Sequence, residues 1–347
     1  MKAFVCLMVV SVTIFISSHY SFAKCPTRMG SLYPQDNFWV IAHRGSVTKF
    51  PENTFPAFQE ALDIDGANSL EIDLSLTNDK KVVLWHDWDP NSPTALIRQG
   101  GREPVVKFLP STPPPSHSRW RQKTSELTLS QLRAQYGYEE KITHYKSRAR
   151  IPTFQEFIEW AQHQDKLQLV LLKFRVPREE IPLLSVMLKK IKAIMDSLDS
   201  PQRFQLVFSI PYKDALKKIK NQFSDFMFSY DQEIPAVGVV NYHRFTTIPR
   251  AMELRNGFAE IGLSAMPILA SPPPMDPWVI YQHVLSLDFK IRDNYRNSTS
   301  EYIKMISWNF NDEEKMRCLI NLGIDGIVTD RPDVLRNLAL DMGKKLD

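Results

Sequence analysis

The chain has 347 residues, of which 43% are apolar and 24% charged, and its formal net charge at pH 7 is +4. This is the composition of an ordinary globular protein with a sizeable core, and it excludes intrinsic disorder. The charge is small for the length, and no dense Lys/Arg stripe is interleaved with aromatic residues, so we expect no nucleic-acid partner. The length suits two average domains or one α/β barrel with insertions.

The N-terminus has the layout of a secretory signal. Lys2 precedes an apolar run from Phe4 to Ile16, and the polar stretch after it ends in small residues. We therefore expect residues 1–23 to be a signal peptide cleaved after Ala23, and the mature protein to be secreted or periplasmic. The run is shorter than the roughly 20 residues that span a bilayer, so a retained anchor is the lesser alternative. We expect no transmembrane segment in the mature chain.

Removal of the signal would leave Cys25 and Cys318 as the remaining cysteines. In an oxidising compartment these two thiols could pair, but a buried, unpaired Cys318 on a helix agrees equally well with the sequence. Two cysteines alone do not form a zinc site.

From residue 39 onward, short β-rich runs alternate with segments of helical periodicity. The expected strands are Trp39–Ala42, Ser69–Leu76, Val82–Trp85, Leu167–Phe174, Phe204–Ile210, Phe226–Tyr230, Ile261–Ala265, Met305–Trp308 and Gly326–Val328. The expected helices include Thr54–Ile64, Phe154–Gln164, Pro182–Ser197, Lys213–Asn221, Glu313–Asn321 and Pro332–Asp341. About eight such units, with no glycine-rich dinucleotide fingerprint after the first strand, predict a closed (β/α)8 TIM barrel rather than an open Rossmann sheet.

Residues 88–150 interrupt this alternation. The segment holds seven prolines, three of them consecutive at 113–115, and a loop this long inside a compact domain is usually functional or mobile. We interpret it as an insertion over the barrel mouth, within one domain that spans residues 38–340. A second proline cluster, at 272–274, is interpreted as a turn from a strand into a helix.

The predicted strand Ser69–Leu76 alternates strictly between apolar and polar residues. In a barrel its Leu and Ile residues would pack against helices, so Glu71 and Asp73 would point inward. Ionised groups are costly there unless they are paired or bound to a metal, and the two acids therefore suggest a cation. An antiparallel strand with one face in water is the alternative, and this strand alone does not decide between them.

Two histidines follow predicted strands. His43-Arg44 ends the first one and His86-Asp87 ends Val82–Trp85, so both imidazoles would lie at carboxyl ends of strands, where barrel active sites are assembled. Histidine titrates close to neutral pH and suits general acid and base roles. The planar guanidinium of Arg44 suits a phosphate. With the inward acids, these groups predict cleavage of a phosphodiester assisted by a divalent metal.

Five separated strings, in this order, resemble the glycerophosphodiester phosphodiesterase family. They are Ala42-His43-Arg44-Gly45, Pro51-Glu52-Asn53-Thr54 with Ala57-Phe58, Gly66-Ala67, Glu71-Ile72-Asp73 and Val82-Val83-Leu84-Trp85-His86-Asp87. Later strings at residues 126–129, 151–154, 308–312 and 322–332 also look like that family, so the resemblance covers roughly residues 38–335.

The resemblance implies a barrel hydrolase with defined roles for these residues. In it, His43 and His86 are the acid/base pair, and Arg44 contacts the substrate phosphate. Glu71 and Asp73 would hold the divalent cofactor, Mg²⁺ or Ca²⁺.

The resemblance also implies that Lys173 faces the same pocket and binds the phosphate. Two residues before such a lysine the family usually has an acidic metal ligand, whereas this chain has Leu171. Residues two apart share one face of a strand, so Leu171 should face the pocket without binding the metal. A site with two carboxylates suits Mg²⁺ better than Ca²⁺, which prefers six to eight oxygens. Glu52 and Asn53 would either organise the loop after the first strand or signal the start of the next helix.

We therefore predict a metal-dependent hydrolase that converts glycerophosphodiesters to glycerol 3-phosphate and an alcohol, with a small-molecule or lysolipid phosphodiester as substrate. One alternative is an enzyme similar to the secreted phospholipase D toxins (sphingomyelinase D), acting on lysophospholipids. Another is a non-catalytic phosphate-binding protein, an idea motivated by Leu171 but opposed by the two histidines. The alcohol group and the identity of the metal are left open by the sequence.

Overall fold

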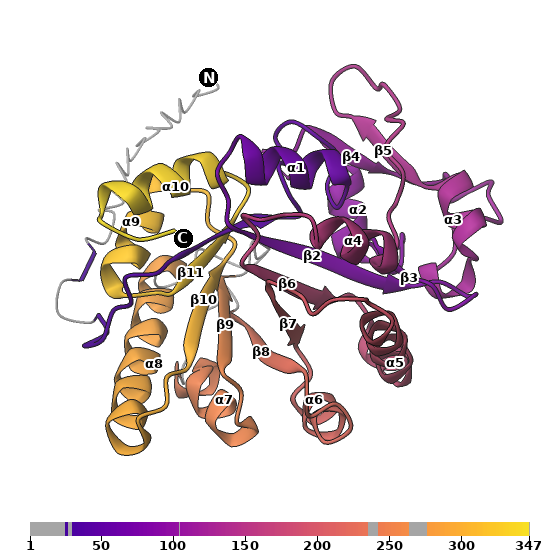
Figure 1. Cartoon of the computed structure of the whole chain (residues 1–347). Coiled ribbons are helices and arrows are strands. Elements are labelled where there is room, and N and C mark those ends of the chain that lie inside the picture. The colour runs from indigo at the N-terminus through magenta and orange to yellow at the C-terminus, as the bar shows by residue number, and fades with distance from the viewer. Residues whose placement is uncertain (1–24, 27–29, 104, 235–241, 264–275, 347) are drawn as a thin grey trace, which may run out of the picture.

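The computed structural model describes residues 25–26, 30–103, 105–234, 242–263 and 276–346 (Figure 1). The predicted signal peptide and the proline cluster at 272–274 lie outside these ranges, as do the last two residues of the strand predicted at 261–265.

Eight parallel strands close into a barrel (Figure 1). They are β1 (Trp39–His43), β2 (Ser69–Leu76), β6 (Leu169–Phe174), β7 (Gln205–Ile210), β8 (Met227–Ile234), β9 (Phe258–Leu263), β10 (Lys304–Trp308) and β11 (Gly326–Thr329). Each strand pairs with the next in this order, and β11 pairs with β1 to close the circle. The predicted (β/α)8 TIM barrel is confirmed.

Helices follow the strands and cover the outside of the barrel. They are α1 (Phe55–Asp63), α4 (Phe154–Ala161), α5 (Pro182–Asp196), α6 (Lys213–Lys220), α7 (Ile248–Leu254), α8 (Pro277–Thr299), α9 (Glu313–Leu322) and α10 (Pro332–Asp341). Of these, α7 was not predicted, and α8 was expected only as a helix after the proline cluster. The buried face of α8 carries charged residues such as Arg292, which pairs with Asp325 at 2.8 Å, and these obscure its apolar period. Within the described ranges, no helix combines the length and apolar character needed to cross a bilayer.

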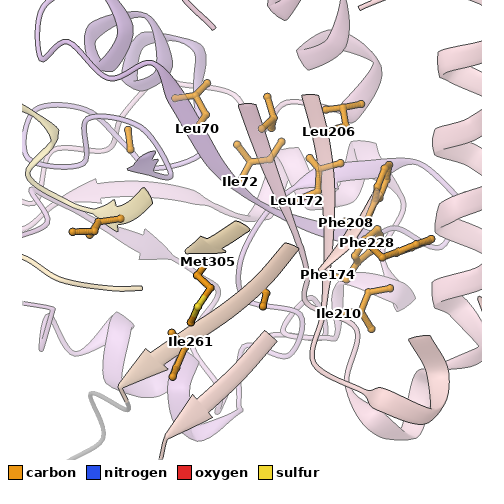
Figure 2. Packing of buried hydrophobic residues seen from close by; sticks show 14 of the residues in the cluster. Leu70, Ile72, Leu172, Phe174, Leu206, Phe208, Ile210, Phe228, Ile261 and Met305 are labelled. Carbon is orange, nitrogen blue, oxygen red and sulfur yellow. The ribbon is translucent and has the colours of Figure 1, made fainter. Parts of the chain in front are cut away.

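Apolar side chains of the strands form two separate clusters. The larger lies between the barrel and its helices, and Figure 2 shows members of it such as Leu70, Ile72 and Leu172. The smaller fills the barrel interior and consists of Ile41, Leu169, Leu171, Val207, Phe258, Ile306 and Val328. Most of these interior residues are followed, two positions later at the carboxyl end of the strand, by a polar residue or by Trp308. Residues two apart on a strand share a face, so these later side chains also point into the barrel. This rule places the polar site directly above the apolar interior.

The short strand β3 (Val82–Leu84) corrects one prediction. It is not a barrel strand: it pairs antiparallel with the end of β2, with Leu74 opposite Leu84. Only residues 77–81 connect the two strands, and a parallel pairing would need a crossover of a dozen residues or more. His86 therefore does not lie at the carboxyl end of a barrel strand. His86 is instead brought to the barrel mouth by the antiparallel return of the chain along β2, where the Trp85 N–H donates to the Asp73 carbonyl at 3.1 Å.

The segment 88–150 contains regular elements that were not predicted. They are α2 (Pro93–Gln99), β4 (Phe108–Ser111), the 3₁₀ turn Thr124–Glu126, α3 (Leu129–Gln135) and β5 (Gly137–Glu140). Strands β4 and β5 form a two-stranded antiparallel sheet of their own.

A disulfide joins Cys25 to Cys318 of α9, with Cα atoms 5.4 Å apart. This settles the pairing that the sequence left open. A backbone hydrogen bond from the Ser31 N–H to the Leu322 carbonyl holds the same N-terminal stretch to the end of α9, and the disulfide holds it to the middle of that helix.

Candidate active site

His43, at the end of β1, is oriented by a carboxylate from the neighbouring strand. Its Nδ1 lies 2.6 Å from Oδ1 of Asp330, the residue directly after β11. Asn309 and Asn311 donate to the other oxygen of Asp330 at 3.1 and 2.5 Å. Burial alone would raise the pKa of Asp330, but His43 and the Asn311 amide lower it below its ordinary value. An ionised Asp330 therefore fixes the imidazole and leaves Nε2 directed at Glu71, 3.9 Å away.

His86 is oriented in the same way by the residue that follows it. Its Nδ1 lies 2.6 Å from Oδ1 of Asp87, and both side chains are buried. Burial, together with the positive charges of Arg175, Arg98 and Arg44, holds the pKa of His86 well below its usual value. The imidazole is therefore neutral at pH 7, which is the form that accepts a proton.

Glu71 and Asp73 of β2 are buried in the barrel, as their alternation predicts. Burial and the neighbouring Asp73 raise the pKa of Glu71 to about 7. Burial also opposes ionisation of Asp73, yet Arg44 and Arg175 lower its pKa below the ordinary value. The pair therefore consists of an ionised Asp73 and a Glu71 that titrates near neutral pH.

This carboxylate pair could hold a cation. Both oxygens of Glu71 and the Oδ1 atom of Asp73 are buried without a hydrogen-bond partner, which is costly unless another group meets them. No cluster of three or more His, Cys, Asp or Glu side chains arranged for a metal occurs in the part of the chain described by the structure. A divalent ion would therefore take two protein carboxylates and complete its shell with other oxygens, as Mg²⁺ commonly does.

Arg44 is fixed by three carboxylates. Its Nε lies 2.8 Å from Asp73, and its Nη1 lies 2.8 Å from Glu52 and 3.6 Å from Glu103. Burial alone would lower the pKa of Arg44, but these charges raise it well above the ordinary value. The neighbouring Asn53, at a left-handed φ of 54°, exchanges two hydrogen bonds of 3.1 Å with Asp73. Glu52 and Asn53 thus organise the loop around the site.

Arg98 of α2 was missed by the sequence interpretation. Its side chain is 2% exposed and donates to both Asp87 and Glu52. The Arg98 guanidinium therefore connects Asp87, which orients His86, to Glu52, which holds Arg44. Its position in a proline-rich segment gave no sign that it reaches the barrel mouth.

Lys173 faces the barrel interior, as the resemblance implied, and meets partners that the sequence did not suggest. Its Nζ lies 3.2 Å from Asp231, 3.5 Å from Glu260 and 4.0 Å from the ring centroid of Trp308. Burial opposes its charge, but Asp231 and Glu260 raise the pKa of Lys173 above its ordinary value. Leu171 lies opposite Glu71 in the β2–β6 register and belongs to the interior apolar cluster, so this position offers no ligand.

The structure thus brings all six predicted site residues to one end of the barrel, and Asp330, Asp231, Glu260 and Arg98 join them. A TIM barrel with two carboxylate-oriented imidazoles, a buried acid pair and fixed cations at its mouth has the groups of a phosphodiesterase. Residues 43–334 match the family model described as the glycerophosphoryl diester phosphodiesterase family. The chain belongs to this family and is a phosphoric diester hydrolase.

Individual relatives agree with this assignment. The chain is 23% identical over 313 residues to a glycerophosphodiester phosphodiesterase of Caldanaerobacter subterraneus, covering 86% of this chain and 97% of that protein. It is 23% identical over 303 residues to human lysophospholipase D GDPD1, covering 86% and 84%. Among solved structures, a putative glycerophosphoryl diester phosphodiesterase from Silicibacter pomeroyi aligns with a TM-score of 0.61 at 18% identity, over 92% of this chain and 98% of that one. An Oleispira antarctica phosphodiesterase in complex with its product sn-glycerol-3-phosphate aligns with a TM-score of 0.53 at 20% identity, over 87% and 96%.

Proposed function

We propose that the protein is a metal-dependent hydrolase that cleaves glycerophosphodiesters to glycerol 3-phosphate and an alcohol. The observation that carries the proposal is the pair of imidazoles, His43 and His86, each held by its own carboxylate beside the buried acids Glu71 and Asp73. Binding a phosphate would not require two oriented acid/base groups, which argues against a non-catalytic protein. The product bound in the Oleispira antarctica phosphodiesterase is consistent with the products proposed for this chain.

The two histidines would divide the proton transfers between them. One removes the proton of the nucleophile, and the other protonates the leaving alkoxide. Burial keeps His86 neutral, so it can accept the proton of the nucleophile, and we assign protonation of the leaving alkoxide to His43. The nucleophile is water or a neighbouring hydroxyl of the substrate, and the hydroxyl would give a cyclic phosphate first.

Positive groups at the mouth would hold the phosphate. Arg44 and Lys173 are kept charged by neighbouring carboxylates, so both can face the substrate phosphate. Glu71 and Asp73 would hold the ion, Mg²⁺ in preference to Ca²⁺ because only two carboxylates are available. When bound, the ion would neutralise charge on the phosphoryl oxygens.

A lysolipid is the second substrate class to test. The similarity to human lysophospholipase D GDPD1 spans 86% of this chain, which supports testing a lysophospholipid alongside the glycerophosphodiesters. The comparisons give no support to a sphingomyelinase D-like activity.

We also propose that the protein is secreted or periplasmic after removal of residues 1–23. The disulfide between Cys25 and Cys318 supports this location, because disulfides persist in oxidising compartments.

Phosphorus-31 NMR tests the proposal. Glycerophosphocholine, lysophosphatidylcholine and sphingomyelin are each incubated with the protein in Mg²⁺, in Ca²⁺ and in a chelator. We expect glycerol 3-phosphate from glycerophosphocholine, with Mg²⁺ supporting faster turnover than Ca²⁺ and the chelator stopping it. Full activity in the chelator would contradict the metal site, and no turnover of the first two substrates would contradict the hydrolase.

A further inference from the structure

An unusually exposed isoleucine lies in the hairpin that follows β5. Ile142 is 83% exposed, more than any other large apolar side chain of the described residues, and Tyr145 is 58% exposed. The turn is closed by polar contacts: the N–H and hydroxyl of Thr143 both donate to the carboxylate of Glu140, and the Glu140 N–H donates to the Tyr145 carbonyl at 2.8 Å. The fold of the turn therefore needs neither apolar side chain.

The same hairpin concentrates positive charge. Residues 141–150, which we call the basic hairpin, contain Lys141, Lys146, Arg148 and Arg150 and no acidic residue. The whole segment 88–150 has eleven Lys and Arg against five Asp and Glu, a net charge of +6, whereas the complete chain has +4. The rest of the chain is therefore slightly negative, and a polyanionic surface would be attracted to this segment.

The base of the basic hairpin is linked to the rim of the active site. The Lys141 ammonium donates to the carbonyl of Glu103 at 3.1 Å, and the carboxylate of Glu103 lies 3.6 Å from Arg44. A surface bound by the hairpin would therefore lie near the site.

We propose that the basic hairpin docks the protein on an anionic lipid bilayer. Ile142 and Tyr145 would enter the interface, and Lys146, Arg148 and Arg150 would lie among the lipid headgroups. Apolar and aromatic side chains flanked by cations are the composition of interfacial membrane-binding segments. A nucleic acid would use the cations but would give an exposed isoleucine no apolar surface to enter. This inference goes beyond the proposed hydrolysis and does not depend on it, because binding is measured without turnover.

Vesicle sedimentation tests the proposal on the complete chain. Vesicles of phosphatidylcholine alone are compared with vesicles that also contain phosphatidylglycerol. Wild type should bind the anionic vesicles more tightly than the neutral ones, and the apolar run at 4–16 contributes equally to binding in every variant. A double variant with Lys146→Gln and Arg148→Gln should bind about 30-fold more weakly, since each basic side chain near an anionic surface contributes about fivefold. A double variant with Ile142→Ser and Tyr145→Ser should lose about tenfold or more.

Matched controls come from elsewhere on the surface. Ile64 is 68% exposed but lies between two aspartates, so Ile64→Ser should bind like wild type. Lys217→Gln with Lys218→Gln removes the same charge from α6 and should also leave binding unchanged. All variants keep the apolar run at 4–16, so its contribution is common to every comparison. Turnover of soluble glycerophosphocholine should be the same in all of them.

Two outcomes would overturn the proposal. Equal binding by all variants would exclude the basic hairpin as the docking site. If the charge variant lost binding while the Ile142/Tyr145 variant did not, the hairpin would adsorb electrostatically without inserting into the bilayer. Binding of duplex DNA as tightly as vesicles would lead to the same conclusion.

Discussion

Replacing Arg98 with methionine tests how the 88–150 segment supports the site. The guanidinium is 2% exposed and contacts two buried carboxylates, Asp87 and Glu52. Removing one partner of a buried ion pair typically costs about 3–5 kcal/mol, because the remaining charge is left without compensation. Glu52 keeps its 2.8 Å contact with Arg44 and Asp87 keeps its contact with His86, so we expect a loss at the lower end of this range, about 3 kcal/mol.

The loss should depend on pH in a defined direction. Burial already raises the pKa of Asp87, and without Arg98 it would rise further. A carboxyl whose pKa is higher in the folded than in the unfolded state destabilises the protein as pH rises above its unfolded value. The stability difference between wild type and Arg98→Met should therefore be larger at pH 8 than at pH 5.

Turnover should fall as well, because Asp87 no longer has a fixed position from which to orient His86. A displacement of about 1 Å at a catalytic group can cost about 10²-fold, and the loss should appear in kcat more than in KM. Thermal unfolding across pH and phosphodiesterase assays measure the two effects. Arg133→Met is the control, since Arg133 in the same segment pairs with Glu156 and contacts no site residue. If Arg98→Met resembled this control in stability and in kcat, the bridging role of Arg98 would be refuted.

Three further predictions concern the carboxylate pair, the vacant ligand position and the disulfide. In metal-free protein the pKa of Glu71 is raised from 4.5 to about 7, so this carboxyl should cost wild type about 3 kcal/mol between pH 4.5 and 7, in addition to the losses from Glu260 and Asp288, whose pKa values are also raised to about 7. Glu71→Gln should lack the Glu71 contribution and be the more stable protein at pH 8; pH profiles of equal slope for wild type and variant in calorimetry would contradict this. Leu171→Glu, opposite Glu71 in the sheet, should tighten metal binding, most clearly for Ca²⁺, and lower the metal-free melting temperature; unchanged affinity by calorimetry would withdraw the two-carboxylate site. Cys25→Ser should cost about 2–5 kcal/mol and make the melting temperature insensitive to reductant, and a stability equal to that of oxidised wild type would show that Cys25 and Cys318 do not pair in solution.

The sequence predicted the half of the site that lies on β1, β2 and β6, although strand periodicity alone identified only the acid pair of β2. Strict alternation in Ser69–Leu76 identified Glu71 and Asp73 as inward residues. The family resemblance assigned Lys173 to the pocket, and parity with this lysine placed Leu171 on the same interior face. These predictions held because a period of two is a local property of the chain that barrel closure preserves.

Two carboxylates were missed because strand boundaries are weakly encoded. The strand predicted at Phe226–Tyr230 stopped one residue before Asp231, and the one predicted at Ile261–Ala265 began one residue after Glu260. The structure extends both strands to include these residues. Extending the alternation by one position at each strand end would have revealed both.

Arg98 and the orientation of His86 depend on tertiary contacts. The sequence places a histidine after a strand, and the five-residue connection at 77–81 is the local feature that indicates an antiparallel return. For Arg98 no local pattern exists, because its partners Glu52 and Asp87 lie 46 and 11 residues away. Such contacts follow from how the 88–150 segment packs on the barrel and cannot be read from periodicity.

The most direct test of the central claim is the rate of glycerol 3-phosphate release from glycerophosphocholine by wild type, His43→Ala and His86→Ala in saturating Mg²⁺. If the two imidazoles are the acid and the base, each variant should lose at least the roughly 10²-fold typical of such catalysis, while its thermal unfolding remains cooperative. The wild-type rate should show a bell-shaped dependence on pH. Turnover at the wild-type rate in either variant would contradict the account.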